Sequence, residues 1–432
     1  MNSKKKNFTV VAAILVVFDL LCMFMYAGMQ VEQMNIIQTF ITEEGGGWSA
    51  NLTMLPLTIG NLAAIVLTMV YGTLMIKFGV KKIMIPFMAL TGLGCIGIAL
   101  ANGLDCFGGT EAGSFPLFFI SLFVIRCCCP IFQMGGAMLI TNWFIKLRGR
   151  MASIGSIGAT IFTIVGTSLM PNVISKSWNG DYRPFYYGIA VLTLIMILVL
   201  VFLLKDVPED AGMYPDGMDH APLSEINDST PIKASVMLRD KKFWQLTIVM
   251  VAPQFVVPAI MSSMAISFMT RGGQELWLAA TVFVSAGAIA GIPCSLAYGW
   301  LNDKIGSLKT EILFILSMLI PTLSLIFMPS HKSVILLIIL AIGLANILGA
   351  APVMGPCFIA YVYGRKQYQS ANRIAFALSL IPGAFSGIMM TALIQSGHAK
   401  LAYLILVIII AISFTSLMTM RKLPDANAAD RS

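Results

Sequence analysis

The feature that most constrains the fold is a series of long apolar segments that recur along almost the entire sequence. A helix that crosses the hydrocarbon core of a bilayer needs about 20 mostly apolar residues. Twelve such segments are present, at 8–30, 51–73, 83–102, 116–140, 151–173, 185–204, 243–268, 277–298, 311–328, 334–359, 374–394 and 401–420. Only 11% of the 432 residues are charged, whereas soluble domains carry about a quarter. The sequence therefore predicts an all-α membrane protein with twelve transmembrane helices.

Lysine and arginine residues are distributed unevenly between the connections on the two sides of the membrane. With the N-terminus placed in the cytoplasm, 22 of the 28 fall in cytoplasmic segments and 5 in outer ones. Cytoplasmic loops of membrane proteins carry this excess. We therefore expect a multi-pass protein of the plasma membrane with both termini cytoplasmic. The net charge of +8 arises from short clusters between apolar runs, so we expect no nucleic-acid partner.

The longest hydrophilic connection divides the chain almost in half. It predicts an N-terminal six-helix bundle at 1–204, a cytoplasmic linker at 205–241, and a C-terminal six-helix bundle with a short cytoplasmic tail at 242–432. Glycines spaced by four residues let helices approach closely, and we expect two such pairs where the bundles meet. They are Gly287 with Gly291 and Gly383 with Gly387.

A short motif follows the second span of each half. It reads YGTLMIKFGVKK in the first half and YGWLNDKIGSLK in the second, which indicates parallel internal repeats. Both copies resemble the cytoplasmic loop motif of the major facilitator superfamily, although Ile76 stands where that family usually has an aspartate. The resemblance implies two pseudo-symmetric six-helix bundles and a loop that takes part in conformational change. The residues expected in this loop are Gly72, Gly79, Gly299, Asp303, Lys304 and Gly306.

Two further stretches resemble the monocarboxylate and oxalate:formate transporter groups within that superfamily. They read GGGWSANLTMLPL before span two and NWFIKLRGRMASIGSIGA before span five. This likeness implies a small organic anion, a carboxylate, as the substrate. The charged binding residues of those groups have no counterparts, since Gln30 stands where the monocarboxylate group has a lysine and span eight reads SAGAIAGIP. The binding residues must therefore be sought in this chain itself.

Two ionisable side chains lie deep inside predicted spans, Asp19 in the first and Arg126 in the fourth. Each costs about 2.5–3.5 kcal/mol or more at the bilayer centre. Counted from the predicted span ends, both are expected about 15 Å deep, at mid-membrane. The resemblance to proton-coupled members of the superfamily, with an acid in span one that faces an arginine in span four, implies that they lie beside each other. Four interpretations are open: Asp19 couples transport to protons, Arg126 binds a substrate carboxylate, the two form a permanent structural ion pair, or they make no contact.

Helical spacing extends this candidate site along the same spans. Tyr26 and Gln30 share a face of span one with Asp19, and Gln133 shares a face of span four with Arg126. Gln254 and Asn346 hold the corresponding inner positions of the second half. Amides inside spans face protein or a wet cavity. Each is therefore a candidate for substrate binding, with interhelical hydrogen bonding as the alternative.

The sequence thus predicts a secondary active transporter of a small organic solute that works by alternating access. Its expected partners are a small-molecule substrate, protons and the lipid bilayer, and we expect a monomer. The alternative is proton-driven efflux of drugs or metabolites, although span five lacks the central Gly-Pro typical of antiporters. The sequence has no HExxH, GxSxG or CxxC pattern. We therefore expect no enzymatic activity, no cofactor and no metal site.

Overall fold

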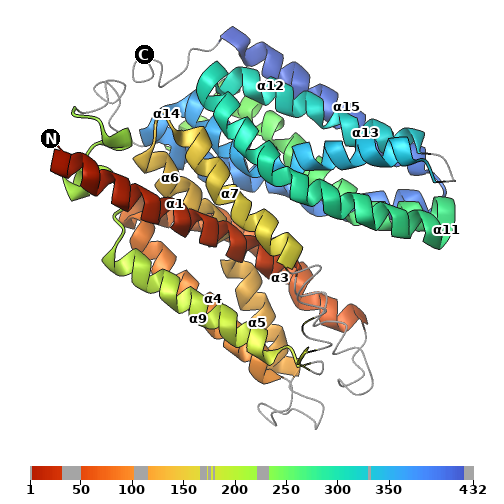
Figure 1. Ribbon diagram of the computed structural model, residues 1–432, viewed down its shortest axis with the longest axis horizontal. Helices are drawn as coiled ribbons and strands as arrows, with labels where there is room; N and C mark the ends of the chain where they lie inside the picture. The colour runs from red at the N-terminus through yellow and green to blue at the C-terminus, as the bar shows by residue number, and fades with distance from the viewer. Residues whose placement is uncertain are drawn as a thin grey trace. The chain divides into compact units, whose positions relative to one another are not determined.

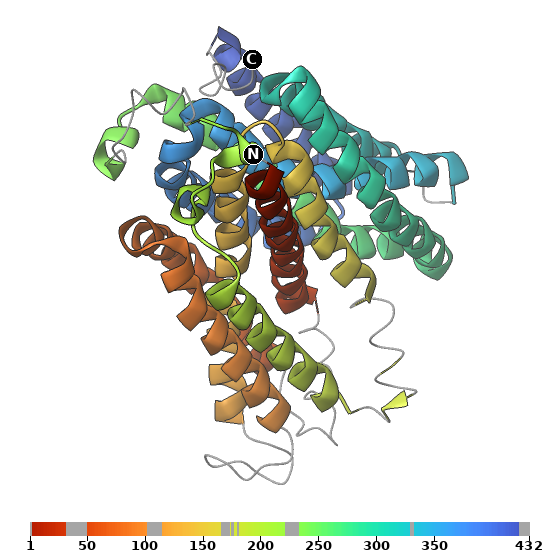
Figure 2. The same ribbon diagram turned by 60° about the vertical axis from the view of Figure 1, so that its left-hand side comes forward.

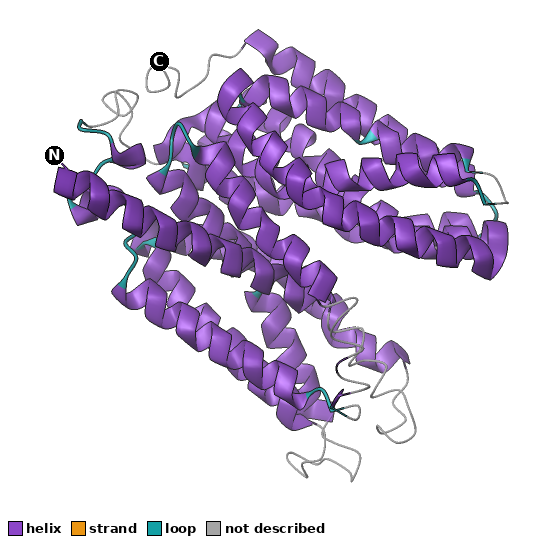
Figure 3. Cartoon of the chain, viewed as in Figure 1, coloured by secondary structure: helices purple, strands orange, loops and turns teal. Residues whose placement is uncertain are grey.

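The computed structural model describes residues 2–31, 50–101, 115–165, 173, 177–178, 181–220, 233–328 and 332–422. Every regular element within these ranges is a helix, as Figure 3 shows. Nine of the described helices are long and apolar enough to cross a membrane. The predicted all-α membrane fold is therefore confirmed.

The described residues form two compact units. The first comprises residues 1–140 and 161–213, and the second comprises residues 141–160 and 214–432. The predicted bundle limits at 204 and 242 stay a prediction. Residues 141–160, although N-terminal in sequence, pack with the C-terminal residues.

In the first unit, α4 packs against α5 and α9, and α3 packs against α5. Figure 2 shows α9 lying along α4. Helices of the N-terminal part of the chain are α1 (Asn2–Val31), α3 (Ala50–Phe78), α4 (Val80–Ala101), α5 (Phe115–Cys128), α6 (Pro130–Trp143), α7 (Arg148–Ile164) and α9 (Arg183–Phe202). A short 3-10 turn, η3 (Pro208–Ala211), follows.

In the second unit, α11 and α14 make the most extensive contact, and α12, α13 and α15 pack beside them (Figure 1). Its helices are η4 (Pro215–Gly217), α10 (Ala234–Met237), α11 (Lys241–Ile305), α12 (Ser307–Ser317), α13 (Leu319–Phe327), α14 (Val334–Gln395), α15 (Ala399–Thr419) and η6 (Met420–Lys422). The N-terminal part of α7, up to residue 160, also belongs here.

Two helices are too long for single spans and break at glycine. The 65-residue α11 has φ 61° at Gly273, and the 62-residue α14 has φ 69° at Gly364. A positive φ is available to glycine at little cost, so each helix folds back as two rods. Span four is α5 with α6, and span nine is α12 with α13. Counted in this way, the described helices are consistent with twelve spans.

The GxxxG glycines pack within the second unit, which corrects their predicted place between the bundles. A Cβ on Gly287 would lie 2.8 Å from the carbonyl oxygen of Ala341 on α14. One turn later, a Cβ on Gly291 would lie 3.6 Å from the carbonyl oxygen of Ala345. Gly383 faces the backbone of Gln254 on α11. These glycines therefore bring α11 and α14 together.

This packing predicts different outcomes for two alanine substitutions one helical turn apart. Gly287→Ala forces α11 away from the α14 backbone, and we expect a loss of about 1–3 kcal/mol in stability. Gly291→Ala meets only ordinary van der Waals contact, so its thermal unfolding in detergent should match that of the wild type. Equal destabilisation by both variants would contradict the described helix contact.

Candidate functional site

Arg126 lies on α5 just before a break in span four. Pro130 has no backbone N–H, so the Arg126 carbonyl lacks the usual donor four residues later, and the helix restarts at Pro130 as α6. The Arg126 side chain is 9% exposed. A Cβ on Gly60 of α3 would lie 2.6 Å from the Arg126 Cβ. Close packing between α3 and α5 thus holds the base of this side chain.

Among the described residues, the guanidinium of Arg126 has polar neighbours but no carboxylate. The ionisable groups that interact with it electrostatically are Cys129, Tyr26 on α1 and Tyr186 on α9. Its Nε is buried and has no hydrogen-bond partner among the described residues. The same holds for Oε1 of Gln133, seven residues along span four. Span four therefore presents a cation and an amide oxygen whose bonding capacity the described chain leaves unfilled.

Asp19 is buried on α1, at 4% exposure, and its carboxylate lies directly against Gly136 of α6. Any Cβ at Gly136 would collide with the Asp19 Oδ1. Cys22, one turn further along α1, also contacts this glycine position. The carboxylate therefore occupies space that exists only because residue 136 has no side chain.

The predicted pairing of Asp19 with Arg126 is wrong in its geometry. No ion pair joins them among the described residues, and Asp19 lies opposite Gly136, ten residues from Arg126 along span four. On α1, the Arg126 neighbour Tyr26 is seven residues from Asp19, which corresponds to about 10 Å along the helix. The observed span four, Phe115–Trp143, is centred within one residue of the predicted 116–140. Counting from the span ends gives depth within one helix, but it does not give the register between α1 and span four.

The remaining predicted binding residues are distributed over both units. Gln30 lies in α1, but its side chain is outside the described residues. Gln254 is half-buried on α11 and contacts Gly383 through its backbone. Asn346 on α14 accepts a hydrogen bond from the Tyr298 hydroxyl at 3.4 Å and donates to the Ile342 carbonyl at 2.8 Å. Tyr186 was not identified from the sequence as a neighbour of Arg126. The available signal was a tyrosine hydroxyl within an apolar segment.

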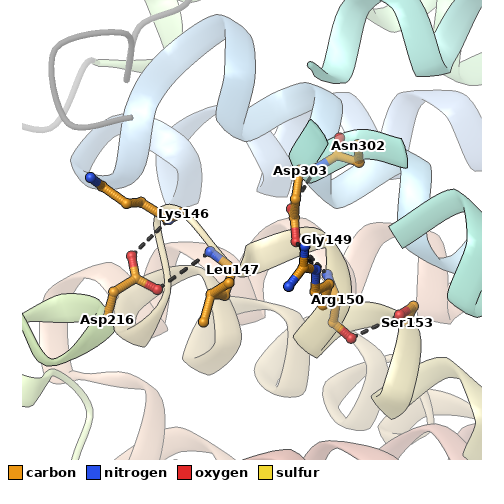
Figure 4. A network of polar contacts seen from close by, with 8 residues as sticks. All are labelled: Lys146, Leu147, Gly149, Arg150, Ser153, Asp216, Asn302 and Asp303. Carbon is orange, nitrogen blue, oxygen red and sulfur yellow. Dashed lines mark hydrogen bonds and ion pairs between the residues drawn. The ribbon is translucent and has the colours of Figure 1, made fainter. Parts of the chain in front are cut away.

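In the second copy of the loop motif, Asp303 caps the N-terminus of α7. The backbone N–H groups of Gly149 and Arg150 donate to its two carboxylate oxygens at 2.9 and 3.1 Å, as Figure 4 shows. The Asn302 amide donates to the same carboxylate at 3.2 Å. The Arg150 Nε is 3.6 Å away and largely exposed, so this pair adds little. The backbone bonds and the helix dipole are the main attraction.

Small residues allow α7 and α11 to approach at this cap. A Cβ on Gly299 would lie 2.5 Å from the Gly149 carbonyl oxygen, and the hydroxyls of Ser156 and Ser295 are 2.5 Å apart. Lys304 instead turns outward, with its Nζ 4.4 Å from the centre of the Trp300 ring. Gly299 and Asp303 therefore form the contact with α7, and Lys304 does not.

The two motif copies close with the same glycine turn, but the carboxylates beside them cap different helices. Gly79 and Gly306 both have positive φ, 93° and 90°, which explains why glycine closes each copy. In the first copy, Gly72 is buried within α3. The helix that follows this copy, α4, is capped by Asp206, which accepts from the Lys81 N–H at 2.8 Å. Burial raises the pKa of Asp206, and the N–H donors of Lys81 and Val80 oppose that rise.

The carboxylate of Asp216, in the 3-10 helix η4, binds the turn between α6 and α7. Its oxygens accept from the backbone N–H groups of Ile145 at 2.8 Å and Lys146 at 2.7 Å. The Leu147 N–H contributes a longer contact of 3.4 Å (Figure 4). Asp216 has φ 54° and is the one non-glycine residue with positive φ among those described. The start of α7 is thus held by two carboxylates from the second unit.

These features define a polytopic helical membrane protein with paired repeats and polar groups inside its spans. The sequence-family model of the Major Facilitator Superfamily matches residues 12–363 of this chain. The chain therefore belongs to this superfamily of membrane transporters, which confirms the predicted family and a transport rather than an enzymatic role. Among curated proteins, none matches this sequence.

Solved structures with the same fold include two sugar symporters. The proton:xylose symporter XylE has a TM-score of 0.72 at 14% identity, covering 98% of both chains. The Escherichia coli fucose:proton symporter FucP has a TM-score of 0.68 at 17% identity, covering 95% of this chain and 99% of that one. A structure of FucP in its outward conformation has a TM-score of 0.67 at 16% identity, covering 96% of this chain and 100% of that one. At these identities the likeness establishes the fold.

The cap geometry predicts the effect of Asp303→Asn. Removing the charge weakens both backbone hydrogen bonds, so we expect the α7 contact to lose about 1–3 kcal/mol. Hydrogen exchange at the amides of Gly149 and Arg150 should become faster and thermal stability should fall. Lys304→Gln, which changes a neighbouring charge outside the cap, serves as the matched control. Unchanged amide exchange in Asp303→Asn would show that the carboxylate does not hold α7.

Proposed function

We propose that this protein is a secondary active transporter of a small organic anion, whose carboxylate binds Arg126. The observation that carries the proposal is the buried guanidinium with an unpartnered Nε among the described residues. The ionisable groups that interact with it are two phenols and a thiol. None of these is an anion at neutral pH under ordinary conditions. The positive charge is left for a ligand to neutralise.

The physical argument rests on the cost of an isolated charge inside a membrane span. A buried cation without an anion is strongly unfavourable, so an arriving carboxylate offsets a cost that the empty protein bears. The planar guanidinium matches a carboxylate with two parallel hydrogen bonds. Tyr26 and Gln133 supply further polar groups for the rest of a small solute. The resemblance to monocarboxylate and oxalate:formate transporters supports the same substrate class.

Asp19 is proposed as the proton-coupling group, at a place separate from the anion. Because it lies against Gly136 rather than Arg126, the proton and the anion occupy different parts of the first unit. Uptake of both then adds no net charge when the anion is a monocarboxylate. This arrangement supports symport of a carboxylate with a proton. It does not support a permanent structural ion pair between Asp19 and Arg126.

The contact at Asp303 is proposed as a gate in the alternating-access cycle. Helix α7 is held by hydrogen bonds and small-residue contacts rather than by a large apolar surface, so it can part from α11 and return. In the proposed topology, with both termini cytoplasmic in the plasma membrane, this contact lies on the cytoplasmic side. The excess of lysine and arginine in those connections supports this orientation.

Substitutions at Arg126 test the anion site in proteoliposomes. The wild type should take up a small carboxylate from a panel of monocarboxylates, dicarboxylates, sugars and amino acids. Arg126→Gln should lower carboxylate kcat/KM by about 100-fold, equivalent to a lost charge-assisted pair of about 3 kcal/mol. Arg126→Lys keeps the positive charge but loses the planar pair of hydrogen-bond donors, so it should retain part of the activity. Selective uptake of a neutral sugar, unaffected by both variants, would overturn the proposal.

Substitutions around Asp19 test proton coupling. Asp19→Asn should reduce the response of uptake to a pH gradient while leaving exchange of labelled for unlabelled substrate intact. Gly136→Ala should reproduce part of this effect, because the added methyl displaces the Asp19 carboxylate. Gly135→Ala is the control, since its methyl meets the flexible end of Met84 instead. Full proton dependence in Asp19→Asn would remove Asp19 from the coupling role.

A further inference from the structure

Glu311 is a buried carboxyl group that sequence reasoning did not identify. It lies on α12, five residues after Gly306, and is 2% exposed. Its Oε2 has no hydrogen-bond partner among the described residues. Span nine was predicted to begin at residue 311, at the membrane edge, whereas α12 begins at Ser307. The carboxyl group is therefore inside the span.

The described surroundings of Glu311 offer it no cation. Helix α12 packs against α11, α13, α14 and α15. Among the described residues, the one ionisable group that interacts with Glu311 is the phenol of Tyr298 on α11. No charged group in the described parts of α13, α14 and α15 interacts with Glu311, and Lys309 on the same helix is exposed. An ionised carboxylate is costly in such a place, whereas the protonated acid carries no charge.

The internal repeat shows that the fold does not require an acid here. Gly79 and Gly306 occupy the same turn of the two motif copies. Five residues after Gly79 is Met84, which is fully buried at 0% exposure, as Glu311 is after Gly306. An apolar side chain therefore fills the equivalent position. The carboxyl group of Glu311 needs a reason other than packing.

A polar connection leads from Glu311 toward Asn346. The Tyr298 hydroxyl donates to the Asn346 Oδ1 at 3.4 Å and also interacts with the Ser317 hydroxyl of α12. The Tyr298 ring packs edge-on against Phe314, with centroids 6.0 Å apart. Tyr298 is thus fixed between the helix that carries Glu311 and the predicted binding residue on α14. A change of charge at Glu311 acts directly on this phenol.

We propose that Glu311 is a proton-binding site of the second unit and that Tyr298 transmits its protonation state to Asn346. The carboxylate takes up one proton on an oxygen atom and becomes a neutral acid. No other bond forms or breaks. Proton binding stands on the geometry alone, whereas the coupling of that proton to solute movement rests on the proposed transport function.

Infrared spectroscopy of the full-length protein in lipid nanodiscs tests proton binding without any substrate. At neutral pH the wild type should show a carboxylic-acid carbonyl band that shifts in heavy water. Glu311→Gln should remove a component of that band, and so should Glu311→Met, which installs the residue of the equivalent position and should preserve thermal stability. Asp19→Asn controls for the other buried carboxyl group. A carboxylic-acid band identical in wild type, Glu311→Gln and Glu311→Met would overturn the proposal.

A second measurement tests transmission through Tyr298. Tyr298→Phe should keep the acid band of Glu311 but lower the number of protons moved per solute, as Glu311→Gln should. Unchanged proton stoichiometry in both variants would refute the coupling. If the wild type moves no carboxylate at all, the proposed function fails, but the infrared comparison still decides whether Glu311 holds a proton. The two failures are therefore distinguishable.

Discussion

The isolated positive charge of Arg126 inside an apolar span is the constraint on which the functional account depends. Low-dielectric surroundings magnify every electrostatic interaction, so a guanidinium there must meet an anion, water or a high energetic cost. Close packing at Gly60 fixes the base of the side chain, and the proline break in span four lies just beyond it. The described protein provides phenols and a thiol beside the charge. We propose that a substrate carboxylate completes the site, and this proposal gives a reason for a transporter to retain so costly a residue.

Glycine and other small residues determine where the charged groups can act. Gly136 makes room for the Asp19 carboxylate, and Gly299 lets α7 reach the carboxylate of Asp303. The two copies of the loop motif use the same glycine turn but recruit different carboxylates, Asp303 in one and Asp206 in the other. These two carboxylates cap different helices: Asp303 caps α7, whereas Asp206 caps α4, the helix that directly follows the first copy.

The sequence predicts the helices, the repeats and the residue types of the site, because charges and glycines are conspicuous within apolar runs. It did not predict the register between helices: the observed spans Phe8–Gly28 and Phe115–Trp143 lie close to the predicted ones, yet Asp19 lies opposite Gly136 rather than Arg126. Glu311 was overlooked because a span limit placed at 311 put it at the edge. Asp216 and Tyr186 were overlooked because their contacts join segments far apart in sequence, and no local pattern reports such contacts.

The most direct test of the central claim compares the binding of a small carboxylate with that of its own primary amide to the purified protein, by ligand-induced thermal stabilisation. The two ligands have the same shape but differ in charge, so the difference between their effects on Tm reports on the interaction with the guanidinium. The account predicts that the carboxylate raises Tm and the amide does not, and that the difference disappears in Arg126→Gln. Equal stabilisation by both ligands, or a carboxylate preference that survives in Arg126→Gln, would contradict it.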